Sequence, residues 1–136
     1  MTRVLAAVAL AAVALAAFPA IACDKEATKV TVAELSSLKK AKAVAVLDAN
    51  DRENRAKMGI IPGAILLTGF EDYSLSQLPK SKSTKLVFYC ANTMCTASEA
   101  AAQRAIAAGY TDVATLPVGI KGWAEAGMPV DHLGKS

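Results

Sequence analysis

The residues with the clearest chemical potential are two cysteines in the segment Tyr89-Cys90-Ala91-Asn92-Thr93-Met94-Cys95. This segment lies between an apolar run at 85–89, typical of a strand, and an Ala-rich run at 96–108, typical of a helix. A cysteine at the end of a buried strand faces the amides of the following loop and the positive end of the helix dipole. Both favour thiolate over thiol and can bind an anion. The position therefore predicts that Cys90 is reactive, with a buried structural cysteine as the alternative.

The first 22 residues are predicted to be an export signal. Arg3 supplies positive charge, 4–18 is a continuous apolar run, and Ala20-Ile21-Ala22 offers small residues for cleavage before Cys23. The apolar core is too short and Ala-rich for a good membrane span, although an uncleaved anchor remains an alternative. Simple cleavage gives a periplasmic or secreted protein, whereas the resemblance of 20–23 to a bacterial lipoprotein box implies lipidation of Cys23. Either way, we expect the mature chain to leave the cytoplasm.

The remaining 114 of 136 residues suffice for one compact domain with a core. We expect a short linker at 23–27, the domain at 28–130 and a tail at 131–136. The mature chain carries 14 Lys and Arg against 12 Asp and Glu, a net charge of +2, and its lysines are scattered among acids. This charge pattern argues against nucleic-acid binding and is too weak for electrostatic membrane binding. We therefore expect membrane contact only through the signal or a lipid at Cys23.

Apolar runs and turn residues predict that strands and helices alternate along the mature chain. Capping boxes are expected at Thr31 with Glu34 and at Thr96 with Glu99. The strands lack alternating polarity, which predicts an α/β fold with a parallel sheet covered on both faces. Ligands of such sheets bind beyond the carboxyl ends of the strands, where Cys90 is expected. The predicted strands are 28–30, 43–47, 64–67, 85–89 and 113–117, and the predicted helices are 32–40, 51–58, one turn at 75–78, 96–108 and 119–126.

The chain resembles the family of single-domain rhodaneses, or rhodanese-like sulfurtransferases. The likeness covers roughly 28–130 and rests on motifs that occur in the family's order. They correspond to a strand ending in Asp-x-Arg, a Gly-His-Ile-Pro-Gly-Ala turn, the strand that carries a persulfide cysteine, and a closing helix. In this sequence they are Leu47-Asp48-Ala49-Asn50, Gly59-Ile60-Ile61-Pro62-Gly63-Ala64, Val87-Phe88-Tyr89-Cys90, and Gly119-Ile120-Lys121-Gly122-Trp123 with Ala126-Gly127-Met128-Pro129-Val130.

The resemblance implies a rhodanese-like α/β fold, with a central, mostly parallel five-stranded sheet, and an enzyme that transfers sulfane sulfur. Cys90 would attack a donor such as thiosulfate, carry the sulfur as a persulfide and pass it to a thiol or cyanide-like acceptor. The substrate-binding loop would use the backbone amides of Ala91, Asn92, Thr93, Met94, Cys95 and Thr96. We expect no cofactor, a monomer, and no metal site, since His132 is the only histidine.

The sequence departs from the family pattern in ways that bear on the donor. Asn50 replaces an arginine and Ile60 a histidine, both at positions we interpret as structural. The loop at 91–96 has neither the glycine nor the cationic residue of many members, although thiosulfate is a dianion. Loss of a charge-assisted bond worth about 1.5 to 3 kcal/mol weakens donor capture roughly tenfold to a hundredfold. The sequence therefore predicts weak thiosulfate use and a preference for persulfides or small organic donors.

The second cysteine of the loop, Cys95, is compatible with more than one class of function. It is either a resolving thiol, which attacks a persulfide or sulfenate on Cys90 and forms a disulfide, or a small residue at the helix start. A disulfide requires Cα atoms within about 7 Å, which a curled loop allows. The alternatives to a sulfurtransferase are a thiol-disulfide redox protein that uses Cys90 and Cys95, and a non-catalytic sulfur-binding module. Phosphatase chemistry is set aside because the first arginine after Cys90 is Arg104, too far along the helix.

Overall fold

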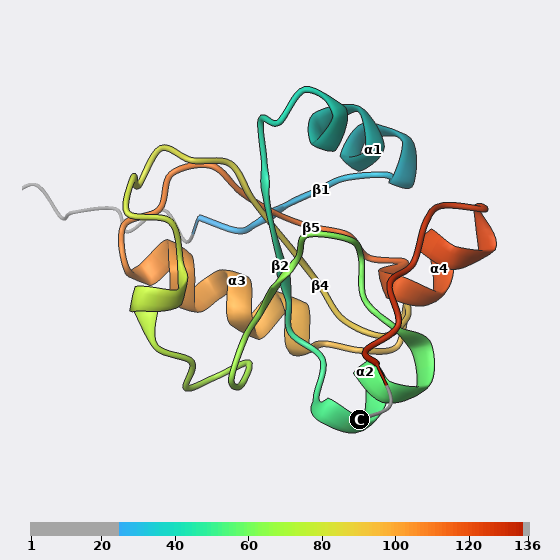
Figure 1. The fold of residues 1–136 in the computed structure, drawn as a ribbon. Coiled ribbons are helices and arrows are strands. Elements are labelled where there is room, and N and C mark those ends of the chain that lie inside the picture. Colours follow the sequence, from blue (N-terminus) through green and yellow to red (C-terminus); the bar gives the residue numbers. More distant parts are fainter. Residues whose placement is uncertain (1–24, 135–136) are drawn as a thin grey trace, which may run out of the picture.

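The computed structural model describes residues 25–134, in which five strands form one sheet (Figure 1). The strand order is β1-β5-β4-β2-β3, and every pairing between these strands is parallel. This arrangement confirms the predicted α/β fold with a central five-stranded sheet. The strands are β1 (Thr28–Lys29), β2 (Ala45–Asp48), β3 (Ile65–Leu66), β4 (Leu86–Tyr89) and β5 (Val113–Thr115).

Helices cover both faces of the sheet, as predicted. Side chains alternate between the faces along β4: Phe88 packs in a core with α3, whereas Val87 packs in a second core with α1 and α4. Trp123 of α4 is buried in that second core. The helices are α1 (Val32–Lys40), α2 (Arg52–Met58), the short 3₁₀ helix η1 (Leu75–Gln77), α3 (Ala97–Ala107) and α4 (Gly119–Glu125).

One of the two predicted capping boxes is confirmed and the other is wrong. At α1, the Thr31 hydroxyl accepts a bond from the Glu34 amide, and the Glu34 carboxylate accepts one from the Thr31 amide. At α3, Thr96 makes no capping bond through its side chain. A capping residue normally has an extended backbone, whereas Thr96 has φ −102° and ψ −2°. The chain thus enters α3 from a tight turn, which leaves the Thr96 hydroxyl unable to cap.

The segment that follows α4 is attached to the rest of the domain. The Trp123 indole donates to the Pro129 carbonyl at 2.8 Å, and Ile60 and Asp131 form an antiparallel bridge. None of the helices within 25–134 is long and apolar enough to cross a membrane. The predicted export signal and Cys23 lie outside the described residues.

Candidate active site

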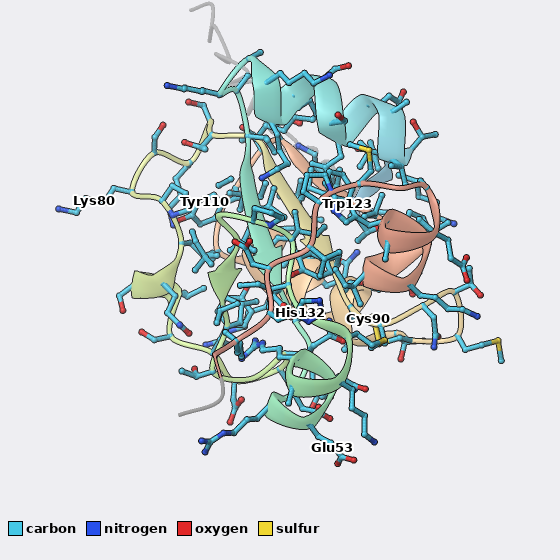
Figure 2. The ribbon with its side chains drawn as sticks, turned by 45° about the vertical axis from the view of Figure 1, so that its right-hand side comes forward. Glu53, Lys80, Cys90, Tyr110, Trp123 and His132 are labelled. Carbon is cyan, nitrogen blue, oxygen red and sulfur yellow. A yellow bond between two sulfur atoms is a disulfide. The ribbon has the colours of Figure 1, made fainter. Side chains whose placement is uncertain are left out.

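Cys90 lies at the carboxyl edge of the sheet, directly after the central strand β4. The β2–β4 register aligns Asp48 with Tyr89, so both strands end beside Cys90. Figure 2 shows Cys90 on the side of the molecule that carries Glu53 of α2, away from Lys80 and Tyr110 at the other end of the sheet. This is the edge at which parallel sheets bind ligands. The predicted position of Cys90 is therefore confirmed, whereas its role is a separate question.

The backbone at Cys90 is held by the start of α4. Ile120 donates its amide hydrogen to the Cys90 carbonyl at 2.9 Å, and Lys121 donates to the Ala91 carbonyl at 3.0 Å. Gly119 has φ +62°, and a Cβ there would lie 2.6 Å from the Cys90 carbonyl oxygen. Only glycine permits both this conformation and this approach. The sequence indicated a closing helix here but not that it contacts the backbone of Cys90.

The loop after Cys90 is a tight turn closed by Asn92. Its side-chain oxygen accepts from the Met94 amide at 2.9 Å, and its carbonyl accepts from the Cys95 amide at 3.2 Å. Thr93 and Met94 at the tip are exposed, and Met94 has 86% of its surface accessible. Two of the amides predicted to bind substrate, those of Met94 and Cys95, are thus engaged within the turn.

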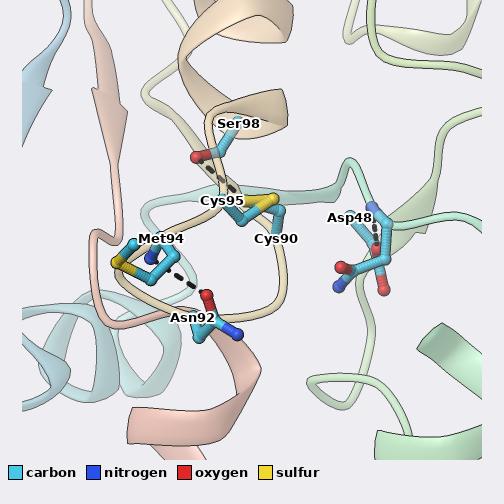
Figure 3. The surroundings of a disulfide bond; sticks show 7 residues. Asp48, Cys90, Asn92, Met94, Cys95 and Ser98 are labelled. Carbon is cyan, nitrogen blue, oxygen red and sulfur yellow. Dashed lines mark hydrogen bonds between the residues drawn. A yellow bond between two sulfur atoms is a disulfide. The ribbon is translucent and has the colours of Figure 1, made fainter.

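Cys90 and Cys95 form a disulfide in this structure (Figure 3). Their Cα atoms are 6.3 Å apart, within the distance that the pairing requires. The turn at Asn92 brings the two residues together, which sequence spacing allowed but did not establish. In this state Cys90 is not a free nucleophile, because its sulfur is bonded. Thiolate chemistry at Cys90 therefore requires that the disulfide be reduced first.

Ser98 is the polar side chain that contacts the Cys90 sulfur. Its Oγ lies 3.6 Å from the Cys90 Sγ (Figure 3). Since a disulfide sulfur carries no hydrogen, the Ser98 hydroxyl is the donor. Ser98 is 3% exposed and lies on the buried, otherwise alanine-lined face of α3. The sequence indicated no role for Ser98 at Cys90, although a serine within an alanine stripe was the available signal.

A buried carboxylate organises the neighbouring strand end. Asp48 accepts bonds from the Tyr89 hydroxyl at 2.6 Å and from the Asn50 amide at 2.7 Å. Burial and the Asp48 carboxylate raise the pKa of Tyr89 well above its usual range, so Tyr89 stays protonated as the donor. The bond from the Asn50 amide makes Asp48 a turn residue at the end of β2. Asp48 thus links the end of β2 to the end of β4, the strand that leads into Cys90.

Arg55 of α2 supplies the positive charge beside Asp48. Its Nε lies 3.3 Å from the Asp48 Oδ1, and its Nη2 donates to the carbonyls of Asp48 and Leu67 at 2.9 and 2.8 Å. Asn50 stands at the position where the family pattern has an arginine, and the cation beside Asp48 comes from α2. The sequence patterns did not indicate the pair of Arg55 with Asp48. Because Arg55 is engaged by Asp48, its charge is already compensated and gives little attraction to an incoming anion.

Comparisons with known proteins agree on the fold. A Rhodopseudomonas palustris protein of unknown function, described as a possible tyrosine phosphatase, is 30% identical with TM-score 0.63, over 77% of this chain and 85% of that one. A human single-domain sulfurtransferase is 25% identical with TM-score 0.60, over 73% and 96%. A thiosulfate sulfurtransferase from Pseudomonas aeruginosa is 26% identical with TM-score 0.64, over 78% of this chain but 20% of that one.

A search among curated proteins found no match. The sequence model of the rhodanese-like domain family matches residues 31–126, which include every element from α1 to α4. This range lies within the domain expected at 28–130 and includes the Cys90 loop. The chain therefore belongs to the rhodanese-like domain family.

Proposed function

We propose that the protein is a sulfurtransferase that carries sulfane sulfur as a persulfide on Cys90. The observation that supports this most is the place of Cys90 in a rhodanese-like domain. It follows the central strand at the ligand-binding edge, and the α4 amides hold its backbone. Two of the similar structures are sulfurtransferases by name. A cysteine so rigidly placed presents its sulfur in one orientation, as a covalent carrier requires.

The transfer proceeds through two displacements at sulfur. The Cys90 thiolate attacks the outer sulfur of the donor and forms a new S–S bond. The donor's own bond to that sulfur breaks, and the leaving group, a thiolate or sulfite, departs with the electron pair. An acceptor thiolate or cyanide then attacks the outer sulfur of the persulfide, which regenerates the Cys90 thiolate. Sulfur is neither gained nor lost over the cycle, and no cofactor takes part.

The site favours persulfide donors over thiosulfate. The loop at 91–96 carries no charged side chain, and Arg55 is paired with Asp48. The nearby Lys121 is exposed, and its ammonium lies 3.8 Å from the Glu125 carboxylate. The thiosulfate dianion would therefore find hydrogen-bond donors at this site but, among the described residues, no unpaired positive charge. The missing charge-assisted bond, worth about 1.5 to 3 kcal/mol, penalises thiosulfate most.

A second function is favoured by the disulfide. In a thiol-disulfide cycle, the Cys95 thiolate attacks the inner sulfur of a Cys90 persulfide, the Cys90–Cys95 bond forms, and hydrosulfide leaves. Their Cα separation of 6.3 Å permits this step. Phosphatase chemistry lacks such support, because the Arg104 Nε donates to the Tyr73 carbonyl at 3.0 Å rather than closing an anion loop. The cycle makes Cys95 a resolving thiol rather than a structural residue.

We further propose that the protein acts as a monomer outside the cytoplasm. The sequence of the first 22 residues supports export, with Cys23 at the new amino terminus. Intact mass of the exported protein separates simple cleavage from lipidation, since a lipidated Cys23 adds the mass of its acyl groups. A Cys23→Ala variant is the matched control, because it can be cleaved but not lipidated.

The test of the transferase proposal uses the reduced Cys95→Ser protein, in which no internal disulfide can form. Exposure to cysteine persulfide is expected to add the mass of one sulfur atom to the Cys90 peptide. Addition of a thiol acceptor is expected to remove that sulfur and produce the acceptor persulfide. Cys90→Ser is the matched control and gains nothing. Sulfur that stays on Cys90 in the presence of every acceptor points to a binding module, and absence of sulfur on Cys90 contradicts the proposal.

A further inference from the structure

The two sulfurs of the disulfide differ in their access to solvent. Cys90 is 2% exposed and belongs to the core between the sheet and α3, whereas Cys95 is half-buried and packs at the edge of that core. The residues on both sides of Cys95 are exposed, and Met94 is the most exposed large apolar residue described. A reagent from solvent thus meets Cys95 first.

We propose that an external thiolate opens the disulfide by attack at Cys95 and that Cys90 is the leaving group, with a dithiol as the class of reductant that completes the exchange. The inference rests on the proposed function, since it explains how the Cys90 thiolate is made available. It assigns Cys95 the role of entry point for electrons, in addition to any role as a resolving thiol. The dithiol stands for a class of reductant, whether a small molecule or a protein.

The reduction balances in two exchanges. In the first, the reductant thiolate forms a bond to the Cys95 sulfur, the Cys90–Cys95 bond breaks, and the electron pair stays on Cys90. In the second, the other thiol of the reductant, as thiolate, attacks its own sulfur in the mixed disulfide. Cys95 then leaves as a thiolate, and the reductant becomes an internal disulfide. Two electrons pass from the dithiol to the protein.

Ser98 favours this direction of cleavage. Its hydroxyl already donates towards the Cys90 Sγ at 3.6 Å, so the bond is in place when negative charge appears on that sulfur. Thiol-disulfide exchange is faster when the leaving thiol has a lower pKa, and a donor to the thiolate lowers that pKa. Cys95 has no described side-chain hydrogen bond of this kind. The access of solvent to Cys95 and the stabilisation of the departing Cys90 thiolate thus favour the same direction of cleavage.

The consequence is a coupling between sulfide release and an external dithiol. Each time Cys95 resolves a Cys90 persulfide, one hydrosulfide leaves and one disulfide forms. The next turnover requires two electrons, delivered through Cys95. The reaction that must act together with this protein is therefore a two-electron thiol oxidation outside the domain. In the absence of a reductant, the site completes a single release.

The test identifies which cysteine forms the first mixed disulfide. The oxidised wild-type protein is mixed briefly with glutathione, quenched in acid, blocked with N-ethylmaleimide and analysed as peptides. We expect glutathione on Cys95 and maleimide on Cys90, in at least roughly tenfold excess over the reverse pattern at the earliest times. Equal labelling, or an excess of glutathione on Cys90, overturns the proposal. Neither result depends on persulfide formation by the Cys95→Ser protein, so the two proposals fail separately.

Ser98→Ala tests the leaving-group half of the argument. We expect dithiothreitol to reduce this variant roughly fivefold more slowly, the effect of about one hydrogen bond. In the Cys95→Ser background, Ser98→Ala is also expected to shift the pH profile of Cys90 alkylation to higher pH. Ser83→Ala removes an exposed serine hydroxyl before β4 and serves as the control without effect. An unchanged reduction rate and pH profile for Ser98→Ala contradicts the role of Ser98.

Discussion

At the scale of single residues, the chemistry of Cys90 depends on which partner its sulfur has. Bonded to Cys95, it has no nucleophilic character; reduced, it keeps the Ser98 hydroxyl as a donor. The charged residues nearby are paired with one another, Arg55 with Asp48 and Lys121 with Glu125. The site therefore combines hydrogen-bond donors with little free positive charge. This balance suits a weakly charged sulfur donor.

Adding a positive charge to the loop should change the choice of donor. Thr93 is exposed at the tip of the turn, so Thr93→Arg brings a guanidinium to the site without disturbing the core. We expect kcat/KM for thiosulfate to rise roughly tenfold or more, and that for cysteine persulfide to change less. The matched control is Ser83→Arg, which adds the same charge before β4, at the opposite edge of the sheet. An equal rise in both variants would mean that net charge, rather than the loop, limits thiosulfate use.

Removal of the Arg55 charge should leave Asp48 buried without its cation. Arg55→Met is expected to lower the free energy of unfolding by about 3 kcal/mol, the range for a broken buried pair. The control lies on the same helix: Lys57→Met removes an exposed pair with Glu53 and is expected to cost under about 1 kcal/mol. Urea unfolding of both variants measures the difference. Similar losses for the two variants would contradict the structural role assigned to Arg55.

At the scale of elements, the start of α4 fixes the loop that carries Cys90. Two amides of α4 bind the carbonyls of Cys90 and Ala91, and the close approach of Gly119 makes these bonds possible. The turn at Asn92 then leads the chain into α3, which carries the Ser98 hydroxyl that contacts the Cys90 sulfur. The position of the sulfur is thus set by three segments that are distant in sequence.

Gly119→Ala should disturb both stability and reactivity. Its Cβ would lie within 2.7 Å of backbone atoms of Cys90 and Ala91, in addition to the strain of φ +62°. Gly127→Ala is the control, because Gly127 has φ +75° but nothing within 4 Å of its Cβ. We expect about 1 to 2 kcal/mol of destabilisation for Gly127→Ala and clearly more for Gly119→Ala. Alkylation of Cys90 in the Cys95→Ser background should slow only with Gly119→Ala, and equal effects would contradict the packing argument.

The contact between Tyr73 and α3 predicts how stability depends on alkaline pH. Burial raises the pKa of Tyr73 to about 12, although the Arg104 guanidinium lowers it. An unfolded tyrosine loses its proton near pH 10, so the unfolded state binds fewer protons above that pH. The free energy of unfolding must therefore fall as pH rises from about 10 to about 12.

Tyr73→Phe separates this titration from the other alkaline effects. At pH 8 the variant should be less stable by about 1 kcal/mol, because it loses the hydroxyl bond to the Ala101 carbonyl, 2.8 Å long. Between pH 10 and 12 the difference from wild type should narrow, since phenylalanine does not titrate. Urea unfolding at a series of pH values measures it. A difference that stays constant across this range would contradict the assigned pKa.

At the scale of the whole molecule, the sequence predicted the order of elements because each carries a local signal. Apolar runs indicated all five strands, and the Thr31 and Glu34 pattern located α1. Cys90 was placed at the strand end for the same reason. Observed strands are shorter than predicted, as at β3, because sheet pairing rather than apolarity sets their ends. Local patterns thus gave the architecture and the position of the candidate nucleophile.

The contacts between distant segments around Cys90 could not be predicted from local sequence patterns. Arg55 of α2 pairs with Asp48 of β2, Ser98 contacts Cys90 from the buried face of α3, and Gly119 approaches Cys90 at the start of α4. None of these follows from spacing, since each depends on how helices pack on the sheet. The disulfide depends likewise on the turn that Asn92 closes. The capping box at Thr96 failed because that turn overrides the local signal.

The central claim is that the surroundings of reduced Cys90 favour its thiolate over its thiol, and the titration of Cys90 tests this most directly. The rate of iodoacetamide alkylation of the Cys90 peptide is measured against pH in the reduced Cys95→Ser protein. We predict an apparent pKa clearly below the value of about 8.5 for a free cysteine. An apparent pKa of about 8.5 or higher would show that burial outweighs the donors around the sulfur, and it would contradict the proposed chemistry.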